Sequence, residues 1–173
     1  MSDVNGGSNG AAGHGPMAQP QGPQISVLAQ YVKDLSFENP HAPTSLQGAK
    51  PTIEIGLDVQ ARPLGIDQYE VVLRVRADAQ GSQSSKTFVV ELVYAGVFGL
   101  RGIPQESIQP ILLIECPRLL FPFARRIVGD ITQSGGFPPL LLEPIDFAAL
   151  FRSQMQAQAQ QREPGAGGQT ELT

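Results

Sequence analysis

The residues of this chain that could carry out chemistry are few and isolated. Its single cysteine, Cys116, lies among apolar residues, and its two histidines, His14 and His41, have no cysteine or histidine at the spacing of metal ligands. A lone thiol in apolar surroundings is typical of a small core side chain rather than of a nucleophile. We therefore predict no metal site and no cysteine-based catalysis.

Two pairs of carboxylates occur four residues apart, Asp34 with Glu38 and Glu54 with Asp58. On an extended strand such residues share a face but lie roughly 13 Å apart, which is too far for a joint acid–base pair. The chain also lacks a Gly-Lys-Ser/Thr phosphate loop, a Gly-x-Gly-x-x-Gly turn and a Gly-x-Ser-x-Gly nucleophile elbow. These observations favour a binding protein over an enzyme.

The composition argues against several other classes of function. The formal net charge is −4, and Arg125-Arg126 is the only adjacent pair of basic residues, whereas nucleic-acid-binding domains usually carry a basic patch. No segment approaches the ~18 consecutive apolar residues of a membrane span, and the N-terminal residues lack the basic start and apolar centre of a signal peptide. We predict a cytoplasmic protein that neither binds nucleic acid nor inserts into membranes.

One domain is predicted between two tails of biased composition. Residues 1–24 are rich in Gly, Asn, Ala, Gln and Pro, and residues 156–173 are similarly poor in bulky apolar side chains. Such segments bury too little apolar surface to offset the entropy of ordering them, so both tails are predicted to be disordered. The folded domain is predicted to span residues 25–155.

Alternation of apolar and polar residues predicts four β-strands before residue 95. The residues predicted to share the covered face are Val27, Ala29, Tyr31, Leu35 and Phe37 in the first strand; Ile53, Ile55, Leu57 and Val59 in the second; Tyr69, Val71, Leu73, Val75 and Ala77 in the third; and Phe88, Val90, Leu92 and Tyr94 in the fourth. The opposite face of the first strand is predicted to carry Gln30, Asp34, Ser36 and Glu38. Short polar links between such strands favour an antiparallel sheet with one covered face.

Residues 105–133 change to the apolar spacing of a helix. Pro117 and Pro122 must start or kink that helix, because a proline has no amide donor. Gly135-Gly136 is predicted to end it, and Asp146 to begin a second helix. Strands followed by helices predict an α+β domain, with a four-stranded antiparallel sheet, a long kinked helix and a C-terminal helix packed on one face.

Two surfaces could bind partners. The outer face of the predicted fourth strand, with Val89 and Glu91, lies beside the acidic face of the first strand, and it is either simply solvated or a docking surface. Six of the eight phenylalanines, namely Phe98, Phe121, Phe123, Phe137, Phe147 and Phe151, follow the alternating runs. They either fill the core or line an open groove that would accept unfolded segments.

Five blocks of the sequence resemble the SecB-type protein-export chaperones and occur in the order of that family. They are residues 31–43 (YVKDLSFENPHAP), 69–75 (YEVVLRV), 95–98 (AGVF), 116–125 (CPRLLFPFAR), and 136–151, which begins GFPPL and ends DFAALF. The resemblance implies a cytoplasmic homotetramer, a dimer of dimers, that holds secretory precursors unfolded and delivers them to the translocase motor SecA. It implies neither ATPase activity nor a cofactor.

The resemblance also assigns roles to residues. It implies SecA docking at Asp34, Glu38, Val89 and Glu91, and effects on assembly at Val90, Leu92 and Tyr94 on the opposite face. It implies grooves for the unfolded client protein lined by Leu46, Ile53, Ile55, Leu57, Phe121, Phe137, Leu141, Phe147 and Phe151. Some family members have a tryptophan before the second strand, where this chain has Gly48-Ala49-Lys50-Pro51.

The residues themselves leave alternatives open. A structural or assembly subunit could dock one folded partner through its outer sheet face, and its grooves would then be incidental. An enzyme acting on a small ligand is a third possibility. A mixed acidic sheet face that coexists with surplus aromatic residues favours the chaperone, because a scaffold would not need both.

Overall fold

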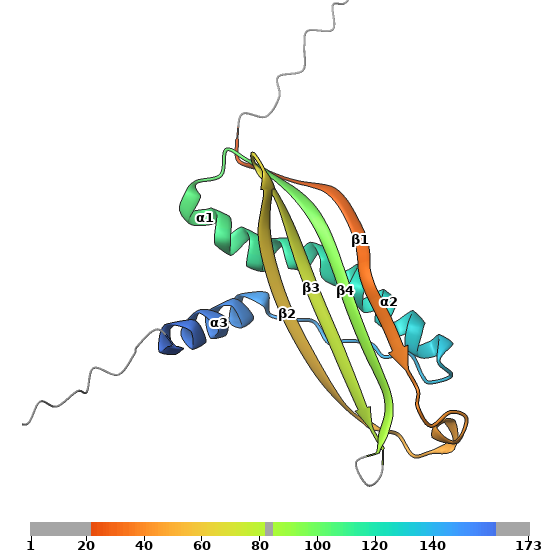
Figure 1. The fold of residues 1–173 in the computed structure, drawn as a ribbon. Helices are drawn as coiled ribbons and strands as arrows, with labels where there is room; N and C mark the ends of the chain where they lie inside the picture. The colour runs from red at the N-terminus through yellow and green to blue at the C-terminus, as the bar shows by residue number, and fades with distance from the viewer. Residues whose placement is uncertain (1–21, 82–84, 162–173) are drawn as a thin grey trace, which may run out of the picture.

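The computed structural model describes residues 22–81 and 85–161, so the predicted disorder of residues 1–21 and 162–173 lies outside the described residues. Four antiparallel strands form one sheet in the order β1-β4-β3-β2 (Figure 1). The strands are β1 (Gln24–Glu38), β2 (Thr52–Gly65), β3 (Gln68–Gln80) and β4 (Lys86–Arg101), and a short 3-10 helix, η1 (Thr44–Gln47), lies between β1 and β2.

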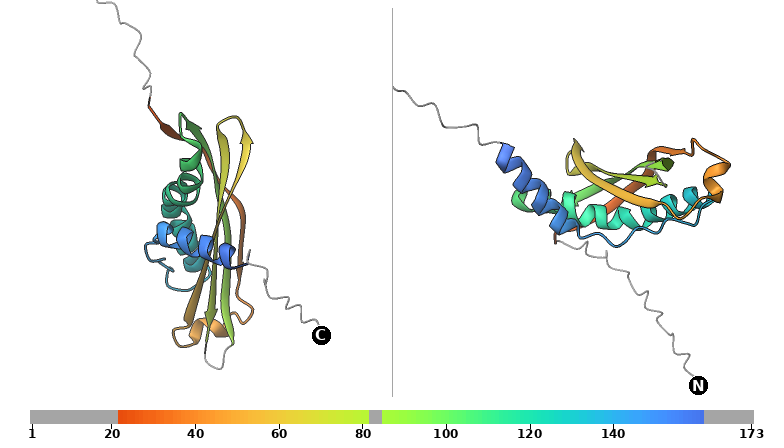
Figure 2. Two further views of the ribbon diagram at one scale, coloured as in Figure 1. Left: turned by 90° about the vertical axis from the view of Figure 1, so that its left-hand side faces the viewer. Right: turned by 90° about the horizontal axis from the view of Figure 1, so that it is seen from below.

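The helices follow the strands in the chain and lie together on one side of the sheet (Figure 2). They are α1 (Gln105–Pro110), a single π-helical turn η3 (Ile111–Glu115), α2 (Cys116–Ser134) and α3 (Phe147–Gln161). This arrangement confirms the predicted α+β class. The last helix continues past residue 155, where the sequence predicts the domain to end, and β1 begins within the predicted N-terminal tail.

The core lies between α2 and the central strands of the sheet. Leu73, Val75 and Leu92 point from β3 and β4 toward the helices and are at most 2% exposed, while Leu120 and Val128 of α2 meet them with no exposed surface. Burial of each such side chain stabilises the fold by about 1.5–3 kcal/mol. Alternation along β3 and β4 therefore fixes which side chains face the helices and which face away.

The strand register confirms the predicted faces of β2, β3 and β4, but three of the nine positions predicted for β1 are wrong. Register shifts between Val27 and Ala29 and between Val32 and Asp34 each insert one residue into β1. Each such bulge reverses the alternation. Tyr31 consequently faces away from the helices, as does Ala29, and Gln30 faces them.

The long helix is interrupted just before Pro117, whereas Pro122 lies inside α2. Pro117 sits in the first turn of α2, directly after the π-helical turn, so its missing amide falls where the ordinary helical hydrogen bonds are already broken. Cys116 at this junction is fully buried, and burial raises the pKa of its thiol to about 12. The cysteine is thus a core residue, as its sequence context predicts.

The segment after α2 is tied back to that helix. Gly136 has a positive φ of 89°, a conformation that favours glycine, and it ends the helix as predicted. The buried Thr132 hydroxyl accepts a hydrogen bond from the Leu140 amide at 2.9 Å. The Asp146 carboxylate then accepts a hydrogen bond from the Ala149 amide at 2.9 Å and caps α3.

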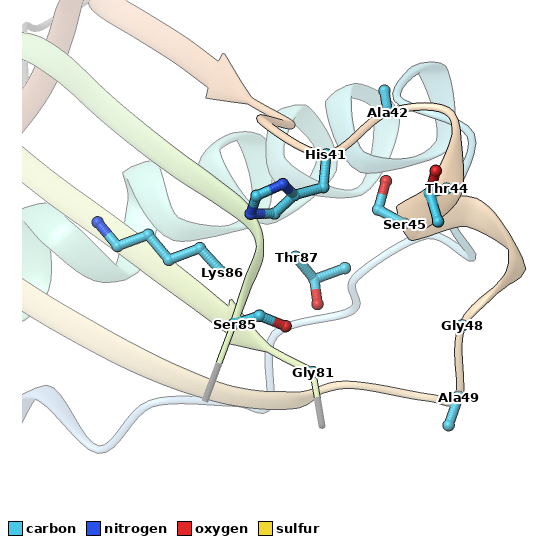
Figure 3. A pocket seen from close by; sticks show the side chains of 10 residues that line it. All are labelled: His41, Ala42, Thr44, Ser45, Gly48, Ala49, Gly81, Ser85, Lys86 and Thr87. Carbon is cyan, nitrogen blue, oxygen red and sulfur yellow. The ribbon is translucent and has the colours of Figure 1, made fainter. Parts of the chain in front are cut away.

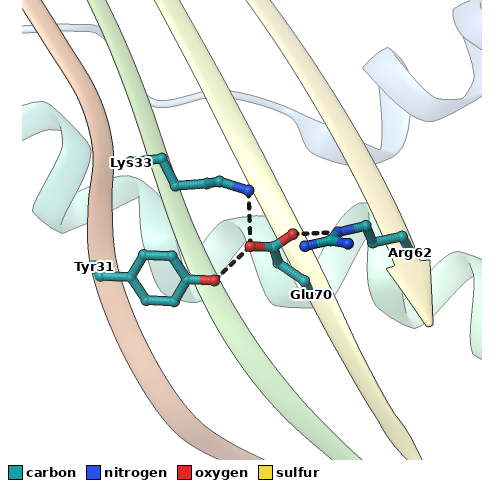
Figure 4. A network of polar contacts seen from close by, with 4 residues as sticks. All are labelled: Tyr31, Lys33, Arg62 and Glu70. Atoms are coloured by element: carbon teal, nitrogen blue, oxygen red, sulfur yellow. Dashed lines mark hydrogen bonds and ion pairs between the residues drawn. The ribbon is translucent and has the colours of Figure 1, made fainter. Parts of the chain in front are cut away.

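A buried carboxylate joins three strands on the side of the sheet that faces away from the helices (Figure 4). Glu70 of β3 is 2% exposed. It accepts hydrogen bonds from the Tyr31 hydroxyl at 2.5 Å, from Lys33 at 3.0 Å and from Arg62 at 2.5 Å. Because Tyr31 and Lys33 belong to β1 and Arg62 to β2, the network links both edges of the sheet across β4.

The same contacts keep Glu70 ionised. Hydrogen bonds from Tyr31 and then from Arg62 lower the pKa of this carboxyl to about 2, against the opposing effect of its burial. A carboxyl whose pKa is depressed by folding stabilises the folded state above its unfolded pKa, and this contribution is lost as the pH falls toward the folded value. The relevant window therefore lies between about pH 5 and pH 2.

We predict that Glu70→Gln lowers the free energy of unfolding by about 2 kcal/mol at pH 7, because it replaces charge-assisted hydrogen bonds with weaker ones. The difference from the wild type should shrink as the pH falls from 5 toward 2. Urea unfolding at one fixed protein concentration measures both effects. Glu54→Gln, at an exposed position on the same side of the sheet, is the matched control. Equal stabilities of Glu70→Gln and the wild type at pH 7 would contradict the role of the network.

Candidate functional site

The four residues predicted to dock SecA lie together on the side of the sheet that faces away from the helices. In the register of β1 with β4, Glu38 lies opposite Val89, and Asp34 lies opposite Val93, which is two residues beyond Glu91. Asp34 and Glu38 are exposed, and the Glu91 side chain is 45% exposed. Val89 is only 6% exposed, so the accessible part of this patch is mainly acidic.

A basic residue that the sequence analysis did not single out lies next to these acids. Arg76 of β3 is the register partner of Glu91 and forms an ion pair with it. Its guanidinium also donates two hydrogen bonds to Asp78, from Nε at 2.7 Å and from Nη2 at 2.9 Å. The hydrogen bonds to Asp78 raise the pKa of Arg76, and the charge of Glu38 adds to this shift. The patch is therefore acidic around one paired cation.

A shallow hollow of about 390 Å³ adjoins this patch on β2, β3 and β4. Gly56 of β2 lies opposite Arg76, and the absence of a side chain there leaves space beside the arginine. Asp58, Arg74 and Glu91 also line the hollow. The outer face of the sheet is therefore both charged and hollowed.

The three residues that the resemblance links to assembly face the helices. Val90 and Leu92 are at most 1% exposed and belong to the core, and Tyr94 is 7% exposed. The Tyr94 ring stacks on Phe123 of α2 with centroids 6.3 Å apart, and its hydroxyl donates a hydrogen bond to Gln30 at 3.2 Å. Tyr94 therefore connects β4 with α2 and with the inner side of β1.

The predicted groove residues do not form one continuous surface. Leu46, Ile55 and Leu141 are between 41% and 62% exposed, whereas Phe147 is only 1% exposed. The remaining five, Ile53, Leu57, Phe121, Phe137 and Phe151, are buried or partly buried. The predicted set therefore combines accessible apolar side chains with core residues.

Two of the aromatic groove candidates pack against each other. Phe121 and Phe147 meet edge to face with ring centroids 5.9 Å apart. Together with Arg118 and Arg125 they line a pocket of about 360 Å³ between α2 and the start of α3. A third candidate, Phe137, packs on Phe88 at a centroid distance of 4.8 Å and belongs to a separate aromatic cluster.

Another pocket lies under the loop that connects β1 to β2 (Figure 3). It has a volume of about 580 Å³ and is lined mainly by small, polar or charged side chains. These include His41, Thr44, Ser45, Lys86 and Thr87. None of the predicted groove residues lines it, so the apolar groove predicted for the loop after the first strand does not coincide with this pocket.

A glutamine-lined pocket was missed by the sequence analysis. It has a volume of about 540 Å³ and lies between β2, α1, the π-helical turn and α3. Five glutamines line it, Gln60, Gln105, Gln109, Gln154 and Gln158, together with aliphatic residues such as Ile108 and Leu113. Glutamines four residues apart share a helix face, so the pairs 105/109 and 154/158 were a signal for it.

In residues 22–81 and 85–161, no three His, Cys, Asp or Glu side chains are grouped so that they could hold a metal ion. No helix in this described part of the chain is both long enough and apolar enough to cross a membrane.

The family model and the similar proteins all point to the same family. The family model described as preprotein translocase subunit SecB matches residues 18–158. The protein-export protein SecB of Xanthobacter autotrophicus is 50% identical over 152 residues, which cover 87% of this chain and 97% of the relative. That of Maricaulis maris is 54% identical over 144 residues, which cover 82% of this chain and 83% of the relative.

A solved structure supports the fold. The SecB-like chaperone of Mycobacterium tuberculosis, in complex with a peptide from an antitoxin, superposes with a TM-score of 0.60 at 17% identity and covers 70% of this chain and 90% of that one. At that identity the likeness concerns the fold alone. The family model and the two relatives, by contrast, extend over nearly all of the described residues, and from them we conclude that this chain belongs to the SecB family of protein-export chaperones.

Proposed function

We propose that this protein holds secretory precursors unfolded in the cytoplasm and delivers them to the translocase motor SecA, without catalysing a reaction and without a cofactor. The observation that carries this proposal is the division of the sheet into two unlike sides. One side presents the exposed acids Asp34, Glu38 and Glu91, and the other presents apolar side chains and a glutamine-lined pocket beside the helices. A chaperone that hands over its client needs two such separate surfaces.

The glutamine-lined pocket suits an extended polypeptide. An unfolded segment exposes backbone donors and acceptors together with apolar side chains. Glutamine amides can both donate and accept hydrogen bonds, and Ile108 and Leu113 supply apolar contacts beside them. Backbone pairing of this kind does not depend on the client's sequence, which fits a chaperone that accepts many precursors.

Exposed leucines near the end of α2 add apolar surface on the helix side. Leu46 of η1 reaches Gly136, whose added Cβ would lie 3.0 Å from the leucine side chain. Leu141 is 62% exposed on the segment that returns along α2. A client that covers these side chains gains about 25 cal/mol for each Å² of apolar surface removed from water.

Kinetics would supply the selectivity. Apolar contacts discriminate weakly between sequences, whereas only slowly folding precursors expose such segments for long enough to be captured. Binding to the unfolded form alone then opposes folding by mass action. No energy source is required for this holding function.

Docking of SecA is proposed for the acidic outer patch formed by Asp34, Glu38, Val89 and Glu91. Negative side chains on the outer sheet face attract a basic surface and orient its approach. The patch lies on β1 and β4, away from the helices, so a motor bound there would leave the client pockets open. This separation supports delivery without prior release of the client.

Self-association into a homotetramer is proposed from apolar surface that a single chain leaves uncovered. The edge strand β1 carries five exposed large apolar residues, Ile25, Val27, Leu28, Val32 and Leu35, and α2 carries two more, Leu119 and Phe123. A long apolar strand edge is prone to pair with another chain. Pairing of β1 with its copy would satisfy that edge, and the exposed side of α2 would supply a second interface.

We predict that sedimentation equilibrium gives the mass of four chains. Val27→Lys combined with Val32→Lys should lower that mass, because both side chains are more than 40% exposed in the single chain and charge there opposes edge pairing. Ile66→Lys, at a 93% exposed position in the turn between β2 and β3, is the control and should leave the mass unchanged. A monomeric wild-type protein would overturn the proposal.

We predict that the protein binds a fluorescently labelled precursor that a folding-defective substitution keeps unfolded, and that it does not bind the folded form. Anisotropy titration measures both affinities. Leu46→Ser with Leu141→Ser should weaken this binding about three- to tenfold through lost apolar burial. Ile66→Ser removes an apolar side chain that is 93% exposed and lies away from the pockets, and it should have no effect. Binding to neither form of the precursor would favour a subunit that docks a folded partner.

We predict that Asp34→Ala with Glu91→Ala abolishes binding to SecA and leaves both the assembly state and client binding unchanged, because the lost charges lie on the outer patch. Surface plasmon resonance with immobilised SecA measures the affinity. Glu54→Ala with Asp58→Ala removes the same charge from the same side of the sheet, on β2, and should bind nearly as tightly as the wild type. Undiminished SecA affinity in the first variant would reject the outer patch as the docking site.

A further inference from the structure

Arg76, the cation next to the outer patch, is placed where it could control docking. Arg76 lies on β3 directly opposite Glu91 and forms an ion pair with it. The Arg76 side chain is 48% exposed and the Glu91 side chain 45% exposed, so both are open to an incoming partner. One of the three exposed acids of the patch is therefore already occupied within the chain.

The other basic residues on this side of the sheet have different surroundings. Lys33 and Arg62 both bind Glu70 in the network that links the strands. Arg74, two residues before Arg76 on the same strand and face, forms no ion pair within the described residues 22–81 and 85–161. Within that part of the chain, Arg76 is thus the cation that competes for a docking acid.

The contacts of Arg76 allow it to release Glu91. Its guanidinium is held on the Asp78 carboxylate by two hydrogen bonds, at 2.7 and 2.9 Å, which do not involve Glu91. If a cation from a partner binds Glu91, Arg76 keeps the Asp78 contact and does not become an unpaired charge. The hollow at Gly56, which Arg76 also lines, provides space beside it.

We propose that Arg76 determines the specificity of the outer patch by occupying Glu91 in the free protein and yielding it to a basic side chain of SecA when the motor docks. This inference rests on the proposed docking function and adds a residue to it. A weakly charged partner would not displace an arginine that is already in place, whereas a partner that presents a well-placed guanidinium would. Arg76 therefore lowers the affinity for every partner and favours strongly basic ones.

Two glutamine variants test the proposal. Arg76→Gln and Arg74→Gln each remove one positive charge from the same strand and face, so long-range attraction to a basic partner changes equally. Only Arg76→Gln also frees Glu91. Exposed ion pairs have modest strength, so we expect Arg76→Gln to bind SecA about two- to fivefold more tightly than Arg74→Gln at low salt. In a Glu91→Gln background this difference should disappear.

The possible failures are distinguishable. Equal SecA affinities for Arg76→Gln and Arg74→Gln would overturn the role of Arg76 while leaving the docking patch in place. Weaker binding by Arg76→Gln would also overturn it, because Arg76 would then contact SecA directly. If the wild-type protein holds unfolded precursor but does not bind SecA at all, the proposed docking function itself is wrong. Circular dichroism of each variant verifies that these half-exposed positions tolerate the change.

Discussion

The packing of α2 against β3 and β4 is the interaction on which the rest of the structure depends. Leu120 and Val128 of α2 pack against one side of the sheet. The alternating side chains of β4 therefore point either into the core or away from the helices. Leu92 goes to the core and its neighbour Glu91 goes outward. The acidic patch and the pockets on the helix side are thus two consequences of one packing arrangement.

The outer face needs a different means of support, because no helix within residues 22–81 and 85–161 covers it. Glu70 supplies that support through hydrogen bonds with both edge strands, and the bulges of β1 make this possible by turning Tyr31 outward. Tyr31 lies opposite Ala95 of β4, and a small residue there leaves room for its ring to reach across to β3. The contacts of Tyr31 and Lys33 with Glu70 therefore help to hold β1, the strand that carries Asp34 and Glu38, in register.

The sequence predicted the elements that depend on regular periodicity and missed those that depend on single insertions or on side-chain reach. Alternation located the strands, and Pro117, Gly136 and Asp146 located the helix boundaries. The bulges of β1 could not be predicted, since one extra residue leaves the local composition unchanged while reversing the face. The pairing of Arg76 with Glu91 depends on the register of two strands, and the glutamine-lined pocket depends on how α3 returns to α1. The spacing of the glutamines indicates shared helix faces, but neither the approach of α3 to α1 nor the Arg76–Glu91 ion pair is encoded in a local pattern.

The central claim is that client and motor occupy opposite sides of one sheet, and simultaneous binding tests it most directly. The measurement is sedimentation velocity with a labelled unfolded precursor, this protein and SecA, mixed without ATP. The account predicts a ternary complex in which the precursor migrates with both proteins, and loss of SecA alone from that complex when Asp34 and Glu91 are replaced by alanine. Displacement of the precursor by SecA, with no ternary species at any ratio, would contradict the account.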